Sequence, residues 1–180
     1  MKTLISILLV LFSSSLFANG FEWIKKQNNL TNTNQLIWEQ NFKDLIKKNI
    51  PDKNIYLGMS NKDEESKLYD NFIKVLHGPP DEIKYYNGGQ YIVATACRYH
   101  SCDEKGLIWI DTQNELLVGL ILHYIYKNEG YNKNGDFLIF SNNFNNFQDI
   151  PSNFNTAVKN WMNDAQVNEP INRRFIGSEN

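Results

Sequence analysis

The stretch QYIVATACRYHSCDEKGLIWID, residues 90–111, decides the fold. It begins and ends with apolar residues at β-strand spacing, which predicts strands at 90–96 and 106–111. Both cysteines of the chain, Cys97 and Cys102, lie between these strands with four residues separating them, one of which is His100. The stretch therefore predicts two strands joined by a cysteine loop over about 97–105.

Three more strands are expected around this pair, at 81–86, 115–126 and 136–140. The first is joined to residues 90–96 by Asn87-Gly88-Gly89, a turn signal because these residues tolerate positive φ. Short links between consecutive strands favour antiparallel pairing. The sequence thus predicts a five-stranded antiparallel meander.

Helical spacing of apolar residues appears on both sides of the strand region. It predicts helices at about 34–48, at 61–76 after a capping box formed by Ser60 to Asp63, and at 153–165. Helices that precede a run of strands, with one more after it, indicate the α+β class. We expect these helices to pack on one face of the sheet.

Residues 1–18 have the pattern of a secretory signal peptide. Lys2 precedes an apolar run from Leu4 to Phe12, then come small residues that end at Ala18. The run is shorter than a membrane span requires. The pattern predicts export to the periplasm, with secretion as the alternative, and removal of 18 of the 180 residues would leave 162.

The rest of the chain suits one domain. Residues 19–33 are polar and predict a flexible leader from which Phe21, Trp23 and Ile24 could dock onto the body. Residues 34–166 are expected to form the domain, and 167–180 a loose polar tail. The formal net charge is −2 with no basic patch, which argues against a nucleic-acid partner. With no second apolar span, we expect no membrane contact in the mature form.

The cysteine loop has several chemical interpretations. A structural zinc site needs four ligands, and besides the loop residues the chain offers only His77 and His123. A redox dithiol has two intervening residues rather than four. A thiolate nucleophile would have no third group to orient its base. A disulfide in an oxidising compartment remains, and residue types leave open whether the loop is only a staple or a binding element.

The loop and its frame resemble the Ivy family, inhibitors of vertebrate (c-type) lysozyme in the bacterial periplasm. The family's loop is Cys-Lys-Pro-His-Asp-Cys, and residues 97–102 keep both cysteines, the basic residue as Arg98 and the histidine as His100. The resemblance covers about 34–165 and is strongest over 80–126.

The resemblance implies a non-enzymatic inhibitor, without cofactor or metal, whose disulfide-closed loop plugs the lysozyme cleft. His100 would reach the two catalytic carboxylates, since a protonated imidazole donates from both nitrogens. Arg98 would add a charge-assisted contact at the rim, and Asp103 and Glu104 could belong to that rim. Because the family includes dimers, a homodimer stays open.

Two positions depart from the family's loop. Tyr99 replaces its Pro, which removes a φ restraint, and Ser101 replaces its Asp, which removes a carboxylate. Tyr99 could instead act as an aromatic anchor. Two alternatives are a binder of another muramidase, such as an endogenous lytic transglycosylase, and a small thiol- or metal-dependent enzyme. His123, Trp109 and Trp161 are interpreted as core residues.

Overall fold

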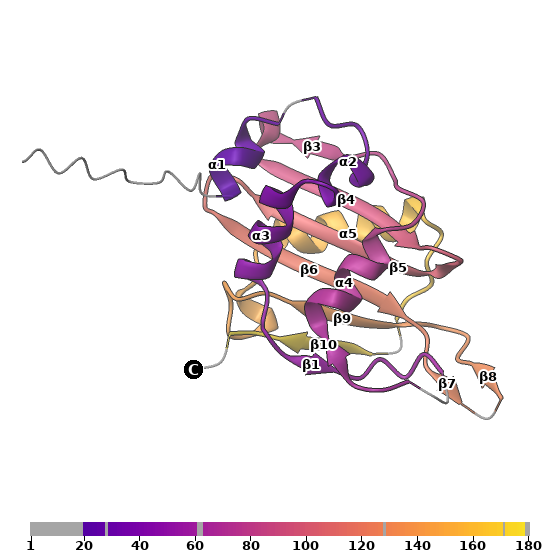
Figure 1. Ribbon diagram of the computed structural model, residues 1–180. Helices are drawn as coiled ribbons and strands as arrows, with labels where there is room; N and C mark the ends of the chain where they lie inside the picture. Colours follow the sequence, from indigo (N-terminus) through magenta and orange to yellow (C-terminus); the bar gives the residue numbers. More distant parts are fainter. Residues whose placement is uncertain (1–19, 28, 61–62, 128, 171, 179–180) are drawn as a thin grey trace, which may run out of the picture.

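Six strands form one sheet between two layers of helices (Figure 1). The computed structural model describes residues 20–27, 29–60, 63–127, 129–170 and 172–178, and the predicted signal peptide lies outside them. No helix within these ranges is both long enough and apolar enough to cross a bilayer. The α+β class is confirmed.

The five predicted strands are present and pair antiparallel in the order expected for a meander. They are β3 (Lys84–Tyr86), β4 (Tyr91–Arg98), β5 (Ser101–Asp111), β6 (Leu116–His123) and β9 (Asp136–Phe140). Two small ribbons flank the sheet, β1 (Asn54–Ile55) with β2 (Ser66–Lys67) and β7 (Tyr126–Lys127) with β8 (Gly130–Tyr131).

The predicted loose tail is wrong, because it contributes a sixth strand. β10 (Arg173–Ile176) pairs parallel with β9, so the sheet is mixed rather than purely antiparallel. Asp136 Oδ1 accepts hydrogen bonds from the backbone and side-chain nitrogens of Asn172, just before the strand. Phe175 and Ile176 then pack against the two hydrophobic clusters on opposite faces of the sheet.

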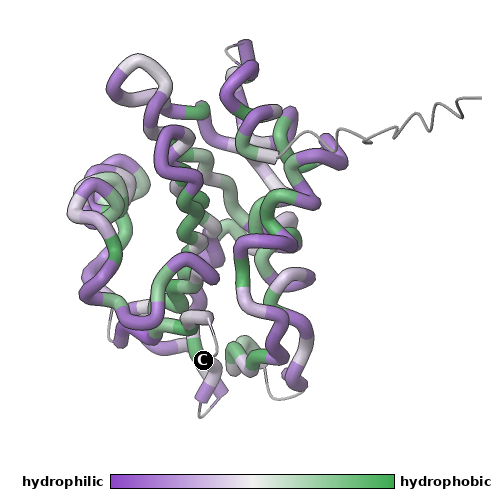
Figure 2. Tube along the Cα trace, turned by 90° about the vertical axis from the view of Figure 1, so that its left-hand side faces the viewer, coloured by the Kyte–Doolittle hydropathy of each residue, from purple (hydrophilic) through white to green (hydrophobic). Residues whose placement is uncertain are grey.

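Helices cover both faces of the sheet, which corrects the prediction of one covered face. On one face lie α1 (Gly20–Lys25), α2 (Thr33–Ile37), α3 (Gln40–Asn49) and α4 (Leu68–Leu76), and on the other α5 (Ser152–Asp164). Figure 2 shows the sheet between these layers, with hydrophobic residues concentrated along it.

The strands themselves explain why both faces are covered. In β5, Ile108 and Ile110 point to the layer of α1–α4, whereas Leu107 and Trp109 point to α5. All five residues of β9 are buried. Strands whose side chains are apolar on both faces must be covered on both.

Two predicted helices have different bounds. The helix expected at 34–48 divides into α2 and α3, because Glu39 between them has an extended backbone, with φ −76° and ψ 127°. The helix expected from residue 61 begins only at Leu68. Asp63 caps a turn instead, accepting a hydrogen bond from the backbone nitrogen of Met59 at 3.0 Å.

The segment expected to be a flexible leader is part of the folded body. Its helix α1 buries Phe21 and Ile24, which are 4% and 0% exposed, and packs against α3. The predicted docking of Phe21 and Ile24 is therefore confirmed, and Trp23 is partly buried against the same cluster, while the predicted mobility of residues 20–25 is wrong. Two apolar side chains one helical turn apart supply the packing that holds this short helix.

Candidate functional site: the cysteine hairpin

The cysteine segment forms the hairpin between β4 and β5, with a turn shorter than expected. The two cysteines are joined in a disulfide, with their Cα atoms 4.7 Å apart. Arg98 pairs with Ser101, which leaves Tyr99 and His100 as the turn. His100 has φ 63°, a left-handed conformation that non-glycine residues adopt uncommonly, whereas Tyr99 is not among the residues with positive φ. The hairpin therefore places His100 at the tip of a covalently closed turn.

A bulge supports this turn from one side. The strand register changes from Cys97 opposite Lys105 to Arg98 opposite Ser101, so residues 102–104 have no partners on β4. Within the bulge Glu104 is buried, and its Oε2 accepts a 2.6 Å hydrogen bond from Nη1 of Arg98. The ion pair joins the two strands behind the turn.

This geometry changes the expected roles of the charged residues. Glu104 does not lie on an exposed rim, and Arg98 pairs with it instead of projecting freely. Asp103 is exposed, as a rim residue would be. The Arg98–Glu104 ion pair stabilises the turn, and we call this pair the brace. Of the two predicted rim residues, only Asp103 is exposed to a partner.

The tip itself is open to solvent. Tyr99 is 65% exposed and His100 is also exposed, with their ring centroids 4.0 Å apart. No hydrogen bond joins the His100 imidazole to another described residue. Both ring nitrogens are therefore available to an external partner.

A second hairpin, β7–β8, projects at the same end of the sheet as the cysteine hairpin (Figure 1). Tyr131 of β8 donates a hydrogen bond from its hydroxyl to the backbone oxygen of Met59, and Met59 Sδ lies 3.8 Å from Arg98 Nη1. Tyr131 is 61% exposed. We call Tyr99 and His100 the tip surface, and Tyr131 is connected to the same hairpin through Met59. Sequence reasoning missed Tyr131, because Met59 links it to the hairpin across distant parts of the chain.

The base of the hairpin is held by the segment after α4. The backbone nitrogen of Cys97 donates to the oxygen of Pro79 at 3.2 Å. Gly78 lies directly against the hairpin backbone: a Cβ there would be 2.5 Å from the nitrogen of Tyr99 and closer still to the oxygen of Cys97. A side chain at position 78 would therefore clash with main-chain atoms, which cannot relieve the clash by changing rotamer.

We expect Gly78→Ala to lower the free energy of unfolding by about 1–3 kcal/mol, the usual cost of overpacking, and to displace the hairpin. Gly130→Ala is the matched control, because a Cβ at that position meets no atom within 4 Å. Urea unfolding of both variants checks the prediction. Equal stability of the two variants would show that the hairpin base is not tightly fixed.

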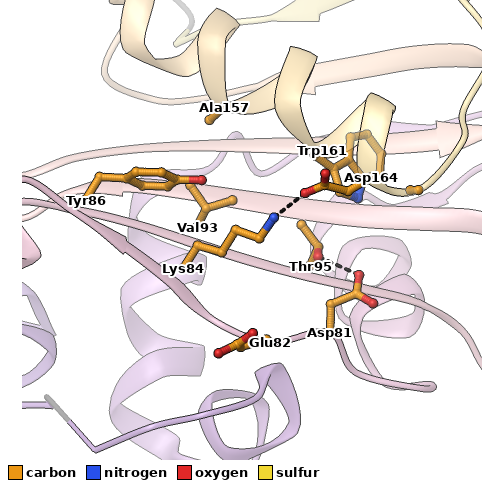
Figure 3. A pocket seen from close by; sticks show the side chains of 10 residues that line it. Asp81, Glu82, Lys84, Tyr86, Val93, Thr95, Ala157, Trp161 and Asp164 are labelled. Carbon is orange, nitrogen blue, oxygen red and sulfur yellow. Dashed lines mark hydrogen bonds and ion pairs between the residues drawn. The ribbon is translucent and has the colours of Figure 1, made fainter.

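Cavities also occur away from the hairpin, and one of them lies between α5 and the strands β3 and β4 (Figure 3). It has a volume of about 210 Å³. Lys84 forms an ion pair with Asp164 across its mouth, and this hydrogen bond raises the pKa of Lys84. Thr95 donates a 2.6 Å hydrogen bond to Asp81. These polar side chains are hydrogen-bonded to one another. We therefore interpret the cavity as a cleft between the helix α5 and the sheet.

Another cavity, of about 280 Å³, lies at the end of β6, on the face covered by α1–α4. His123 and Asp136, which are cross-strand partners, form its floor. His123 is 4% exposed, which agrees with the prediction of a core residue. Its Nδ1 has no hydrogen-bond partner in the described structure.

Burial lowers the pKa of His123 from its ordinary value of 6.5. Asp136 and Asp63 oppose this shift, and Arg174 adds to it. A folded state that disfavours the charged form loses stability as the pH falls from 6.5 toward the folded-state pKa, because the unfolded chain then binds more protons. Above pH 6.5 this contribution is fully present.

We therefore expect the free energy of unfolding to decrease from pH 7.5 to pH 5, and His123→Gln to reduce that decrease. Urea unfolding at several pH values measures both slopes. His77→Gln, which changes an exposed histidine, serves as the control. The same pH slope in the wild-type protein and in His123→Gln would contradict the assignment.

None of the family models, curated proteins or solved structures compared with this chain matches it. Within the described ranges, no group of three or more histidine, cysteine, aspartate or glutamate side chains is arranged to hold a metal ion. The geometry of the hairpin is thus the main structural observation that bears on function.

Proposed function

We propose that this protein inhibits a c-type lysozyme by inserting the cysteine hairpin into the enzyme's substrate cleft. The observation that carries the proposal is the placement of His100. It lies exposed at the tip of a disulfide-closed two-residue turn, with an imidazole that no described residue uses. The resemblance of residues 97–102 to the Ivy loop supplies the target class.

The hairpin is suited to this task because it is held in shape before binding. The disulfide, the Arg98–Glu104 ion pair and the main-chain contact with Pro79 restrain it on three sides. A pre-shaped loop loses less conformational entropy on binding than a mobile one. The Ivy loop has a proline at the position of Tyr99, which restrains φ there. In this protein the three restraints fix the turn in its place.

The chemistry of the tip fits an acidic cleft. Lysozyme acts with two carboxyl groups that flank the scissile glycosidic bond. A protonated imidazole can donate one hydrogen bond to each of them, and neighbouring carboxylates favour this charged form. Tyr99 and Tyr131 would contact the walls of the cleft, since exposed tyrosines are frequent anchors in protein interfaces.

The thiol-enzyme alternative needs a free thiol, and both cysteines of the chain are in the disulfide. The other alternative, binding to a lytic transglycosylase, uses the same hairpin and differs only in the target. We also propose export to the periplasm, which rests on residues 1–18.

Clearing of cell-wall suspensions tests the function. The purified protein is titrated against a c-type lysozyme, a g-type lysozyme and a lytic transglycosylase. We expect lysis by the c-type enzyme to stop near a 1:1 ratio while the other two enzymes keep their rates. An unchanged rate with the c-type enzyme would refute the proposal. Selective loss of transglycosylase activity would instead identify the lytic transglycosylase as the target of the hairpin.

A further inference from the structure

The cavity at the end of β6 is a built site that the hairpin does not use. Its floor carries His123 and Asp136, which are 4% and 7% exposed, and Arg174 of β10 lies at its edge. Arg174 pairs in register with Leu138, two residues from Asp136, so the three side chains belong to the same face of the sheet. Three segments of the chain thus bring a base, an acid and a guanidinium together.

The imidazole of His123 offers an unused acceptor. Its Nδ1 is buried and has no hydrogen-bond partner among the described residues. In a neutral imidazole one nitrogen carries the N–H and the other a lone pair, so Nδ1 is an acceptor when Nε2 holds the proton. Since burial favours the neutral ring, this acceptor is present at neutral pH. A ligand that fits must present an N–H or O–H group to it.

Asp136 and Arg174 define the charges of that ligand. Both hydrogen bonds that Asp136 receives within the described ranges go to Oδ1, which leaves Oδ2 for a cationic donor. Arg174 uses one Nη2 donor on the backbone oxygen of Tyr56, and its other N–H groups remain for an anion. An ammonium beside Asp136 and His123, with a carboxylate beside Arg174, satisfies all three groups.

The wall opposite the sheet is fixed. It consists of Tyr56, Leu57 and Gly58, and it is tied to Arg174 at one end and by a 2.7 Å hydrogen bond from Tyr126 to Gly58 at the other. The volume of about 280 Å³ is enough for a ligand several times the size of a water molecule, but not for a long chain. The space therefore favours a compact ligand.

We propose that this cavity binds a small zwitterion, specifically a free α-amino acid. The ammonium donates to Asp136 Oδ2 and His123 Nδ1, and the carboxylate accepts from Arg174. This proposal does not depend on lysozyme inhibition, because none of its residues belongs to the tip surface.

Titration of the ¹⁵N-labelled protein with glycine and with alanine, followed by NMR, tests the proposal. We expect saturable shifts of the Leu57, Gly58 and His123 signals with a dissociation constant of about 1 mM, a value typical of a weak small-ligand site. Acetate and methylammonium, which each carry half of the zwitterion, should bind at least about tenfold more weakly, because each lacks one charge-assisted contact.

Substitutions locate the site. His123→Leu and Arg174→Gln should each weaken glycine binding about tenfold or more. Arg174 is exposed, so its variant keeps the test valid if the His123 variant does not fold. Arg173→Gln is the matched control, because the neighbouring Arg173 is exposed, pairs with Glu169 and lies over Phe137. Absence of saturable shifts, equal binding of acetate and glycine, or unchanged binding by Arg174→Gln would each overturn the proposal.

Discussion

Replacing His100 should abolish most of the inhibition while leaving the fold intact. Truncation of a central interface residue typically costs about 2–4 kcal/mol of binding free energy, which is a roughly 30- to 1,000-fold rise in the inhibition constant. His100 is exposed and contacts the neighbouring ring of Tyr99, so the thermal midpoint should change little. Clearing assays and a thermal melt of the same preparation measure the two effects.

The backbone at this position needs its own control. His100 has φ 63°, a conformation that alanine adopts less readily than asparagine. His100→Asn therefore keeps the turn while removing the imidazole, and it should lose inhibition as His100→Ala does. Gln113→Ala alters an exposed side chain in the turn between β5 and β6 and should keep full potency. Wild-type potency in His100→Asn would remove the imidazole from the mechanism.

Removing the disulfide should weaken inhibition as well as stability. The crosslink closes a loop of about six residues, for which the chain-entropy model gives about 2 kcal/mol of stabilisation. The Cys97→Ala/Cys102→Ser variant would keep the strand pairing but lose one of the three restraints on the turn. We expect about a 10- to 100-fold rise in the inhibition constant, because the loop must then be ordered on binding.

The double variant is a better test than a reducing agent, because reductant would also attack the disulfides of the lysozyme. Urea unfolding gives its stability, and a clearing assay at a temperature where it is fully folded gives its potency. Full potency in a destabilised variant would show that the turn keeps its shape without the crosslink. In that case the Arg98–Glu104 brace would be the main restraint.

The strands of the meander could be predicted from local pattern, because each is an apolar run that ends at a turn signal. The sixth strand could not: Arg173 to Ile176 is short and half polar, and it becomes a strand only through pairing with β9. The second helix layer was implied by the continuous apolar run of β6, whose residues after Leu116 are all buried. A half-exposed sheet would have alternated apolar and polar residues there.

The candidate site was predictable only in part. Two cysteines close together in a chain with a predicted export signal indicate a tied loop, and the resemblance points to His100. The brace could not be found in this way, because Glu104 has the same local pattern as the exposed Asp103 beside it. Only the bulge in β5 turns Glu104 inward toward Arg98. Tyr131 and the His123 cavity depend on contacts between segments far apart in sequence, which no local pattern encodes.

Competition between the protein and a chito-oligosaccharide for a c-type lysozyme tests the central claim most directly. Calorimetric titration of the protein into the free enzyme should show 1:1 binding, and saturation of the cleft with the sugar should reduce the apparent affinity in proportion to the sugar's occupancy. His100→Asn should bind weakly in both conditions. Absence of binding, or binding that the sugar leaves unchanged, would contradict insertion of the hairpin into the cleft.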